Sequence, residues 1–268
     1  MRPDGPSLTA AGVAAARAVL ERPSTPTGDR EADDRLAASV ASRRTDARRE
    51  RRRRDTREFL SYIATRTKFF DDAVLRAIDT GIAQVVLLGA GYDGRALRFR
   101  TPGVRFFEVD HPATQRDKRA RLDQLLIDSS DITFVAADFT EPGLGDALAR
   151  AGHDADAPSL FTCEGVLRYL PEPAFRGLLA TAANRAAGRS ELAASISTRE
   201  RGVPESAERL ARERQLAAIG EAVLTVPDRQ TALAWLREAG WPEITVDEVA
   251  SFAPGTRPGR LLVVAHRT

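Results

Sequence analysis

The sequence is poor in the residues that build disulfide frameworks and metal sites. One cysteine, Cys163, and three histidines stand among 268 residues, which excludes an intramolecular disulfide and a Cys-based zinc site. The histidines are scattered, so no metal is expected. No apolar run approaches the roughly 18 residues of a membrane-spanning helix. The Ala-rich stretch 8–20 contains Arg17 and follows Asp4, unlike a signal peptide. These absences favour a cytoplasmic protein with no membrane partner.

Lysine is scarce as well, because arginine carries nearly all of the positive charge. Nine arginines and four acidic residues fall within 43–58, although the net charge of the whole chain is only +2. Such a segment is a candidate nucleic-acid-binding patch. Its acidic residues recur at helical spacing with the arginines, and no aromatic residue is present to stack on a base. A solvated or internally paired helix face is therefore favoured, and a nucleic-acid partner is not expected.

The hydrophobic pattern divides the chain into a helical extension and an α/β domain. Residues 1–58 are rich in Ala, Arg and Asp and predict helices on either side of a Pro/Thr/Gly break at 23–28. In 59–268, short apolar runs alternate with amphipathic stretches, which is typical of a parallel sheet with crossover helices. A pair of helices is expected in an insert at about 200–230, where it would form a lid.

The expected strands and helices follow from these runs. Strands are predicted at 84–88, 104–109, 132–136, 159–163, 191–196, 244–249 and 261–266. Helices are predicted at 94–99, 113–127, 145–152, 172–186 and 231–239. In the second of these helices, Asp117, Lys118 and Arg121 are expected to face away from the leucines that pack on the sheet. The last two strands are close enough in sequence to form an antiparallel hairpin.

A glycine turn follows the first strand. Gly89, Ala90 and Gly91 come directly after 84–88, so the backbone can approach a ligand closely before the next helix begins. The third glycine of the dinucleotide fingerprint is missing, and no Gly-Lys-Ser/Thr follows. The turn is therefore neither the dinucleotide fingerprint nor a phosphate loop, and by itself it is either a ligand-binding loop or a simple tight turn.

Acidic residues follow the next three strands. Asp110 ends the second strand, about 20 residues after the glycine turn, where a carboxylate commonly binds a ribose diol. Asp138 follows the third strand and is itself followed by Phe139, a pair that suits an adenine ring. Glu164 follows the fourth strand, at the edge where open α/β sheets bind ligands. Three acids do not suit a polyphosphate, but they suit a nucleoside that carries a positive charge, such as a sulfonium.

These segments resemble a known family. The stretches GAGYDGRALRF, FFEVDHPATQRDKRARL, AADF and CEGVLRYLP, in this order, are similar to the leucine carboxyl methyltransferase family. They resemble most its bacterial branch of S-adenosylmethionine-dependent O-methyltransferases, which includes polyketide-tailoring enzymes. The resemblance covers roughly residues 60–200. It implies a class I methyltransferase sheet of seven mostly parallel strands, S-adenosyl-L-methionine as cofactor and S-adenosyl-L-homocysteine as product.

The resemblance also implies roles for single residues. Arg66 would bind the methionine carboxylate of the cofactor, Asp110 the ribose, and Glu164 the amino end. The whole cofactor-binding set is Arg66, Gly89, Ala90, Gly91, Asp110, His111, Asp138, Phe139 and Glu164. The chain departs from the family at Gly94, where threonine is common, and at Arg168, where an apolar residue is common. The first departure is expected to matter little, and the second to alter the substrate pocket.

The predicted reaction is O-methylation by in-line displacement of the methyl group. The expected acceptor is a carboxylate or hydroxyl of a small molecule or peptide, and the expected setting is secondary metabolism. A carboxylate needs cationic anchors rather than a base, and Arg168 and Arg199 are the candidates. Tyr169 is expected either to contact the substrate or to pack under the following helix. A structural or cofactor-binding role is favoured for His111, which is also the base available for a phenol. The alternatives are a noncatalytic cofactor-binding regulatory protein and a nucleic-acid methyltransferase using 43–58. A homodimer is left open.

Two other residues are interpreted as structural. Cys163 lies in an apolar strand and is expected to pack in the core rather than act as a nucleophile. His153 lies between Gly152 and Asp154 and is expected to be a solvated loop residue.

Overall fold

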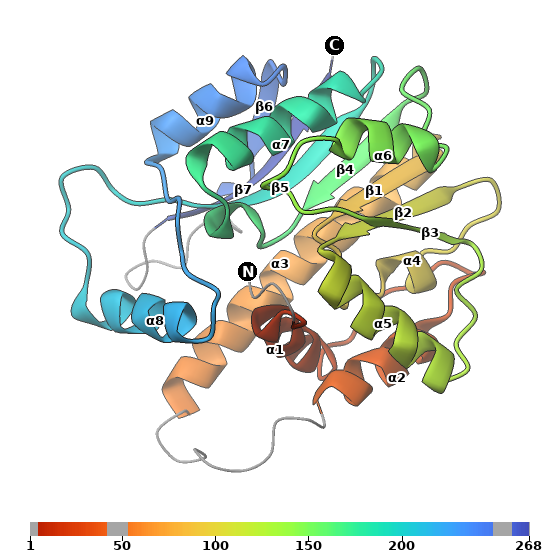
Figure 1. Ribbon diagram of the computed structural model, residues 1–268, viewed down its shortest axis with the longest axis horizontal. Helices are drawn as coiled ribbons and strands as arrows, with labels where there is room; N and C mark the ends of the chain where they lie inside the picture. Colours follow the sequence, from red (N-terminus) through yellow and green to blue (C-terminus); the bar gives the residue numbers. More distant parts are fainter. Residues whose placement is uncertain (1–4, 42–52, 249–258, 268) are drawn as a thin grey trace.

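The computed structural model describes residues 5–41, 53–248 and 259–267, and a seven-stranded sheet lies at its centre (Figure 1). The strands are β1 (Gln84–Leu88), β2 (Arg105–Asp110), β3 (Ile132–Ala136), β4 (Ser159–Cys163), β5 (Glu191–Ser197), β6 (Glu243–Val246) and β7 (Arg260–His266). Their order is β3-β2-β1-β4-β5-β7-β6. The first five pair in parallel, and β7 runs antiparallel to both β5 and β6. The predicted class of sheet, with its antiparallel C-terminal strands, is confirmed.

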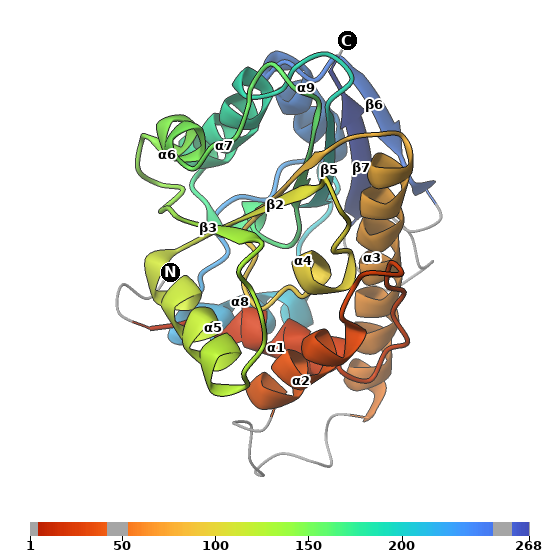
Figure 2. The same ribbon diagram turned by 90° about the vertical axis from the view of Figure 1, so that its right-hand side faces the viewer.

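Helices cover both faces of the sheet (Figure 2). The helical segments are α1 (Leu8–Arg17), α2 (Arg30–Ala41), α3 (Arg53–Asp79), α4 (Arg95–Arg98), α5 (Pro112–Gln124), α6 (Leu144–Arg150), η1 (Leu167–Tyr169), α7 (Glu172–Asn184), α8 (Ala207–Ala218) and α9 (Arg229–Glu238). In β1, Val85 and Leu87 pack in a core with α3, whereas Val86 and Leu88 pack in a second core with α6, α7 and α9. A strand that is buried on both faces reads as a continuous apolar run, which is why the sequence located it.

The N-terminal helices pack against the α/β core. The break predicted at 23–28 lies between α1 and α2, both of which lie at the same end of the molecule as α8 in Figures 1 and 2. Helix α3 runs without interruption through residue 58, where the sequence suggested a boundary. The arginine-rich segment 43–58 lies outside the residues whose side chains are described.

Two expectations about helices are wrong. The insert contains one helix, α8, within 200–230, because Gly220 turns the chain with φ +79° and the segment after it is not helical. In α5, Lys118 and Arg121 are buried rather than solvent-facing, and Leu126, which lies beyond the end of this helix, is 90% exposed. Lys118 is buried because its Nζ donates to Glu108 Oε2 at 2.6 Å, a partner that helical periodicity cannot reveal.

The expectation for His153 is also wrong. Its side chain is buried between Phe107 and Phe161 and shares a hydrogen bond with Ser159 Oγ at 3.0 Å. Cys163 is fully buried, as expected, and burial raises the pKa of its thiol to about 12. Within the described ranges, none of the helices is both long and apolar enough to span a membrane. The same ranges contain no group of three or more His, Cys, Asp or Glu side chains placed to hold a metal ion.

Candidate active site

The glycine turn lies at the carboxyl edge of the sheet, directly after β1. Gly89 and Gly91 have φ values of +75° and +53°, which favour glycine. A Cβ on Gly89 would lie 2.1 Å from a methyl group of Val166, and one on Gly91 would lie 3.0 Å from the Cβ of Ala10 in α1. The turn is therefore packed on both sides, and its backbone faces a cavity.

Asp110, the last residue of β2, binds back to this turn. Its Oδ2 accepts the N–H of Gly91 at 2.5 Å, and its Oδ1 accepts the N–H of His111 at 2.7 Å. Burial raises the pKa of this carboxyl and outweighs both hydrogen bonds, which lower it. Each carboxylate oxygen has a second lone pair. Since Asp110 lines the cavity, it can still accept hydrogen bonds from a ribose diol.

Glu164, which follows β4, is surrounded by three guanidinium groups. Its Oε1 lies 2.5 Å from Arg17 Nη2 and 2.8 Å from Arg66 Nε, and its Oε2 lies 2.7 Å from Arg95 Nη1. Burial alone would raise the pKa of Glu164, but the three arginines outweigh it and lower the pKa to about 2. The result is a buried, ionised cluster of both signs, which suits the zwitterionic end of an amino acid.

The predicted adenine side is more open. Asp138 is exposed and accepts hydrogen bonds from Thr140, while Phe139 packs partly against the core and lines the cavity. The hydrogen bonds from Thr140 lower the pKa of Asp138 although burial opposes them. His111 caps α5, its Nδ1 accepting the N–H of Ala113 at 3.3 Å, and its Nε2 is 3.8 Å from Asp138. His111 therefore belongs to this end of the cavity.

The predicted acceptor-side residues are not all at the cavity. Arg168 and Tyr169 of η1 line it. Arg199 is exposed, is not among the lining residues, and donates from Nε to the carbonyl of Val226 at 2.6 Å. The prediction that Arg199 faces the substrate is therefore not supported, because this side chain holds the chain segment that leads to α9.

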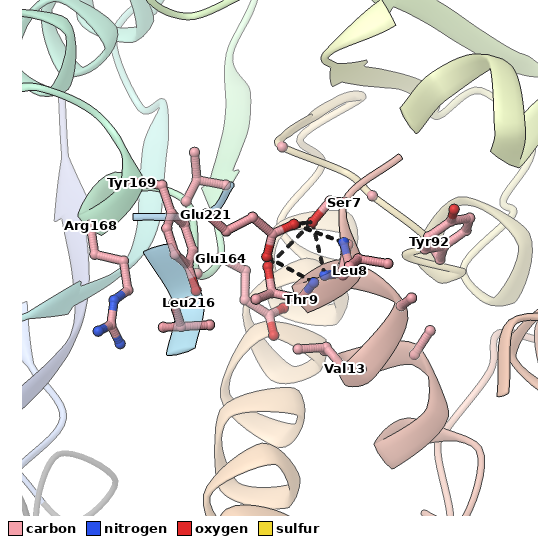
Figure 3. A pocket seen from close by; sticks show the side chains of 18 of the residues that line it. Ser7, Leu8, Thr9, Val13, Tyr92, Glu164, Arg168, Tyr169, Leu216 and Glu221 are labelled. Atoms are coloured by element: carbon pink, nitrogen blue, oxygen red, sulfur yellow. Dashed lines mark hydrogen bonds between the residues drawn. The ribbon is translucent and has the colours of Figure 1, made fainter. Parts of the chain in front are cut away.

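Several cavity residues had no sequence signal. Five further residues line the cavity: Arg17 of α1, Tyr62 of α3, Arg212 of α8, Arg260 of β7, and Glu221, which follows α8 and is labelled in Figure 3. Arg260 places its guanidinium carbon 3.4 Å from the centre of the Tyr62 ring. These residues lie in segments without a recognisable motif, and only the fold brings them to the glycine turn.

The cavity is large enough for a cofactor and a second ligand. Its volume is about 1250 Å³, compared with roughly 300–1,000 Å³ for a typical small-molecule pocket. The sheet side supplies the glycine turn and the acidic residues, and α1, α3 and α8 supply the opposite wall. These residues fit S-adenosylmethionine. Asp110 supplies a carboxylate for the ribose, the cluster around Glu164 supplies both charges for the amino-acid end, and the glycine turn lets the backbone approach the cofactor.

Comparison with known proteins agrees with this geometry. Residues 10–183 match the family model described as leucine carboxyl methyltransferase. The chain belongs to the leucine carboxyl methyltransferase family. The family identification made from the sequence is confirmed, and with it the expectation of S-adenosylmethionine as the cofactor.

Relatives within this family come from actinobacteria. A protein of Frankia alni named "Putative S-adenosyl-L-methionine-dependent methyltransferase" is 36% identical over 255 residues, which cover 90% of this chain and 84% of the relative. Proteins of Streptomyces coelicolor and Streptomyces avermitilis with the same description are 44% and 41% identical, over 51% and 71% of this chain. The matches span only 49% and 65% of those two relatives.

Solved structures share the fold of this chain. A DUF574 family protein from Streptomyces avermitilis is similar with a TM-score of 0.58, at 17% identity over 96% of this chain and 97% of that one. An O-methyltransferase family protein from Burkholderia thailandensis has a TM-score of 0.54, at 14% identity over 94% of this chain and 66% of that one. At such identities the likeness concerns the fold alone.

Proposed function

We propose that this protein is an S-adenosylmethionine-dependent methyltransferase that forms a methyl ester on the carboxylate of a small molecule or peptide, in secondary metabolism. The observation that supports a carboxylate is the charge of the cavity wall beyond the cofactor-binding residues. Arg168, Arg212 and Arg260 reach it from three different elements. Two acidic residues lie on that side: Glu221 accepts hydrogen bonds from Ser7 and Leu8, and Glu213 lies 3.9 Å from Arg168 Nη2. A wall of this kind attracts and orients an anion.

The chain's contribution is to bind, orient and exclude water. Arg17, Arg66 and Glu164 would hold the amino-acid end of the cofactor, and Asp110 would hold its ribose. When bound, the cofactor supplies a methyl group that is already activated on a positively charged sulfur. A carboxylate acceptor is ionised at neutral pH, so the protein needs no general base. This agrees with the position of His111, which caps a helix at the adenine side.

A hydroxyl acceptor is the second candidate, and Tyr62 is the observation that favours it. Its hydroxyl lines the cavity and lies 3.5 Å from Arg66 Nη1. Burial opposes ionisation, but the charges of Arg66 and Arg260 outweigh it and lower the pKa of Tyr62. A lowered pKa favours the phenolate form of Tyr62, and the phenolate could accept the proton of an alcohol or a phenol.

Methyl transfer to paired acceptors separates these candidates. The protein is incubated with methyl-labelled S-adenosylmethionine and with aromatic and aliphatic carboxylic acids, each paired with the corresponding alcohol or phenol. Methyl esters release volatile labelled methanol in alkali, whereas methyl ethers do not. We expect the acids to be labelled and the label to be alkali-labile. Arg168→Ala should raise the KM for the acid about tenfold or more, because a hydrogen bond to a charged group contributes roughly 1.5–3 kcal/mol.

Arg201→Ala is the matched control. Arg201 is 78% exposed at its side chain, pairs with Asp228 and does not line the cavity. Alkali-stable label on the alcohols would favour the hydroxyl candidate instead. Cofactor binding with no transfer to any acceptor would favour the noncatalytic alternative, and equal KM changes in both arginine variants would contradict the proposed role of Arg168.

A further inference from the structure

Glu221 joins the end of the insert to the beginning of α1. Its Oε1 accepts from Ser7 Oγ at 2.8 Å and from the N–H of Leu8 at 2.7 Å, and its Oε2 accepts from the N–H of Thr9 at 3.0 Å (Figure 3). Glu221 is only 6% exposed. A carboxylate at a helix N-terminus is favoured both by these charge-assisted bonds and by the helix dipole. The two segments are therefore joined by buried, charge-assisted hydrogen bonds across more than 200 residues of sequence.

Helix α1 lies across the cofactor end of the cavity and is held at both ends. At its C-terminal end, Arg17 pairs with Glu164 and Asp93. In its first turn, Ala10 packs against the glycine turn, 3.0 Å from where a Cβ of Gly91 would lie. Since residues from both ends of α1 line the cavity, a cofactor bound on the glycine turn lies against this helix. It can exchange only if α1 moves or leaves a gap.

The insert that carries Glu221 is otherwise lightly attached. No residue of α8 is buried. The chain that follows α8 is held by backbone hydrogen bonds from Leu224 and Thr225 to the carbonyl of Arg168. Little apolar surface holds α8 in place, so polar contacts govern how the insert separates from α1. The Glu221 carboxylate makes three of these contacts.

We propose that Glu221 is a positioning residue that holds α1 closed over the cofactor, so that its contact with the α1 N-terminus sets the rates at which the cofactor enters and its product leaves. This rests on the proposed function only in naming the ligand. The contact opens and closes in the free protein and in the complex alike. Weakening it therefore accelerates association as well as dissociation, and changes the equilibrium affinity less than either rate.

Glu221→Gln tests this proposal. Glutamine keeps the shape of the side chain but offers one carbonyl oxygen in place of two charged ones. Dissociation of labelled S-adenosyl-L-homocysteine is measured by chasing the complex with excess unlabelled ligand, and association by rapid mixing. We expect both rates to rise about tenfold, with a smaller change in Kd. Glu208→Gln is the control, because Glu208 is an exposed acid in the first turn of α8.

Leu8→Pro reaches the same contact from the other side. Leu8 is the first residue of α1, a position that tolerates proline, and the substitution removes one N–H that Glu221 accepts. Both rates should rise here too, by a smaller factor. This variant decides the question if Glu221→Gln does not fold, as judged by its circular dichroism.

Two results would overturn the proposal. One is unchanged rates in folded Glu221→Gln and Leu8→Pro. The other is faster dissociation without faster association, which would mean that Glu221 only supports the bound ligand. Failure of the wild-type protein to bind S-adenosyl-L-homocysteine at all would instead overturn the proposed function.

Discussion

The imidazole of His153 is held neutral by its surroundings. Phe107 and Phe161 pack against the ring, and Arg185 lies 3.2 Å from Nδ1. Burial, and after it the charge of Arg185, lower the pKa of His153 to about 4. In the unfolded chain the pKa is near 6.5. Between these values the unfolded state binds more protons than the folded state, so the contribution of His153 to stability is complete above pH 6.5 and is lost as the pH falls towards 4.

His153→Gln should flatten this pH dependence. Glutamine can keep a hydrogen bond to Ser159 but does not titrate. We expect the free energy of unfolding, measured in urea at pH 7.5 and pH 5.0, to fall less for the variant than for the wild type. An equal fall in both proteins would assign the pH dependence to other groups.

At the residue scale, sequence reasoning located the acids better than their partners. Asp110 and Glu164 follow strands that are buried on both faces, so their place at the sheet edge was predictable. Arg17 was not, because its ion pair with Glu164 joins residues almost 150 positions apart and α1 carries no motif. Glu221 was not predicted either, because its partners at the start of α1 are more than 200 residues away in the sequence. The structure places Arg66 against Glu164. The family resemblance had assigned these two residues to the carboxylate and the amino group of the same amino-acid end, but not to each other.

At the element scale, Gly94 determines how closely α2 can approach. A Cβ on Gly94 would lie 1.9 Å from Asp33 Oδ1. Asp33, on α2, is itself fixed by ion pairs with Arg22 at 2.6 Å and Arg98 at 2.7 Å. The expectation that Gly94 matters little is therefore not supported here, since the side chain has no room while α2 keeps this position.

Gly94→Ala and Gly177→Ala form a matched pair. The first should lower the free energy of unfolding by roughly 1–3 kcal/mol, the usual effect of overpacking. Gly177 lies in α7, is exposed and has no atom within 4 Å of an added Cβ. Its replacement should raise the free energy of unfolding by roughly 0.5–1 kcal/mol, because alanine favours the helix. Urea titrations measure both, and a neutral Gly94→Ala would contradict the packing argument.

Prediction of the elements succeeded where burial is two-sided and failed where it depends on a distant partner. The fully buried strands β1 and β4 have the predicted bounds, and so does the edge strand β3, although it is only partly buried. The insert contains one helix rather than the predicted pair. Helical composition at 200–230 does not show that the chain leaves α8 to bring Glu221 to the start of α1. In α5, Lys118 and Arg121 are buried against the prediction, and Lys118 donates to Glu108 and to the carbonyl of Asp93 inside the fold.

At the scale of the whole molecule, the residues that line the cavity range from Pro6 to Arg260, so its closure depends on segments at both ends of the chain. Such segments differ in local stability. Helix α8 has no buried residue, whereas α7 buries Phe175, Leu178 and Leu179 in the core. Without ligand, the amides of α8 should therefore exchange with solvent much faster than those of α7.

Hydrogen exchange measured by mass spectrometry, with and without S-adenosyl-L-homocysteine, tests how the ligand changes this order. Ligand contacts at the glycine turn and at Glu164 should stabilise α1 through Ala10 and Arg17. Because α1 is joined to Glu221, protection should extend to the segment 219–226, while α7 and α9 stay unchanged. Protection confined to the strand ends would show that α1 and the insert do not close as one unit. Uniform protection of the whole chain would show global stabilisation by binding rather than local closure.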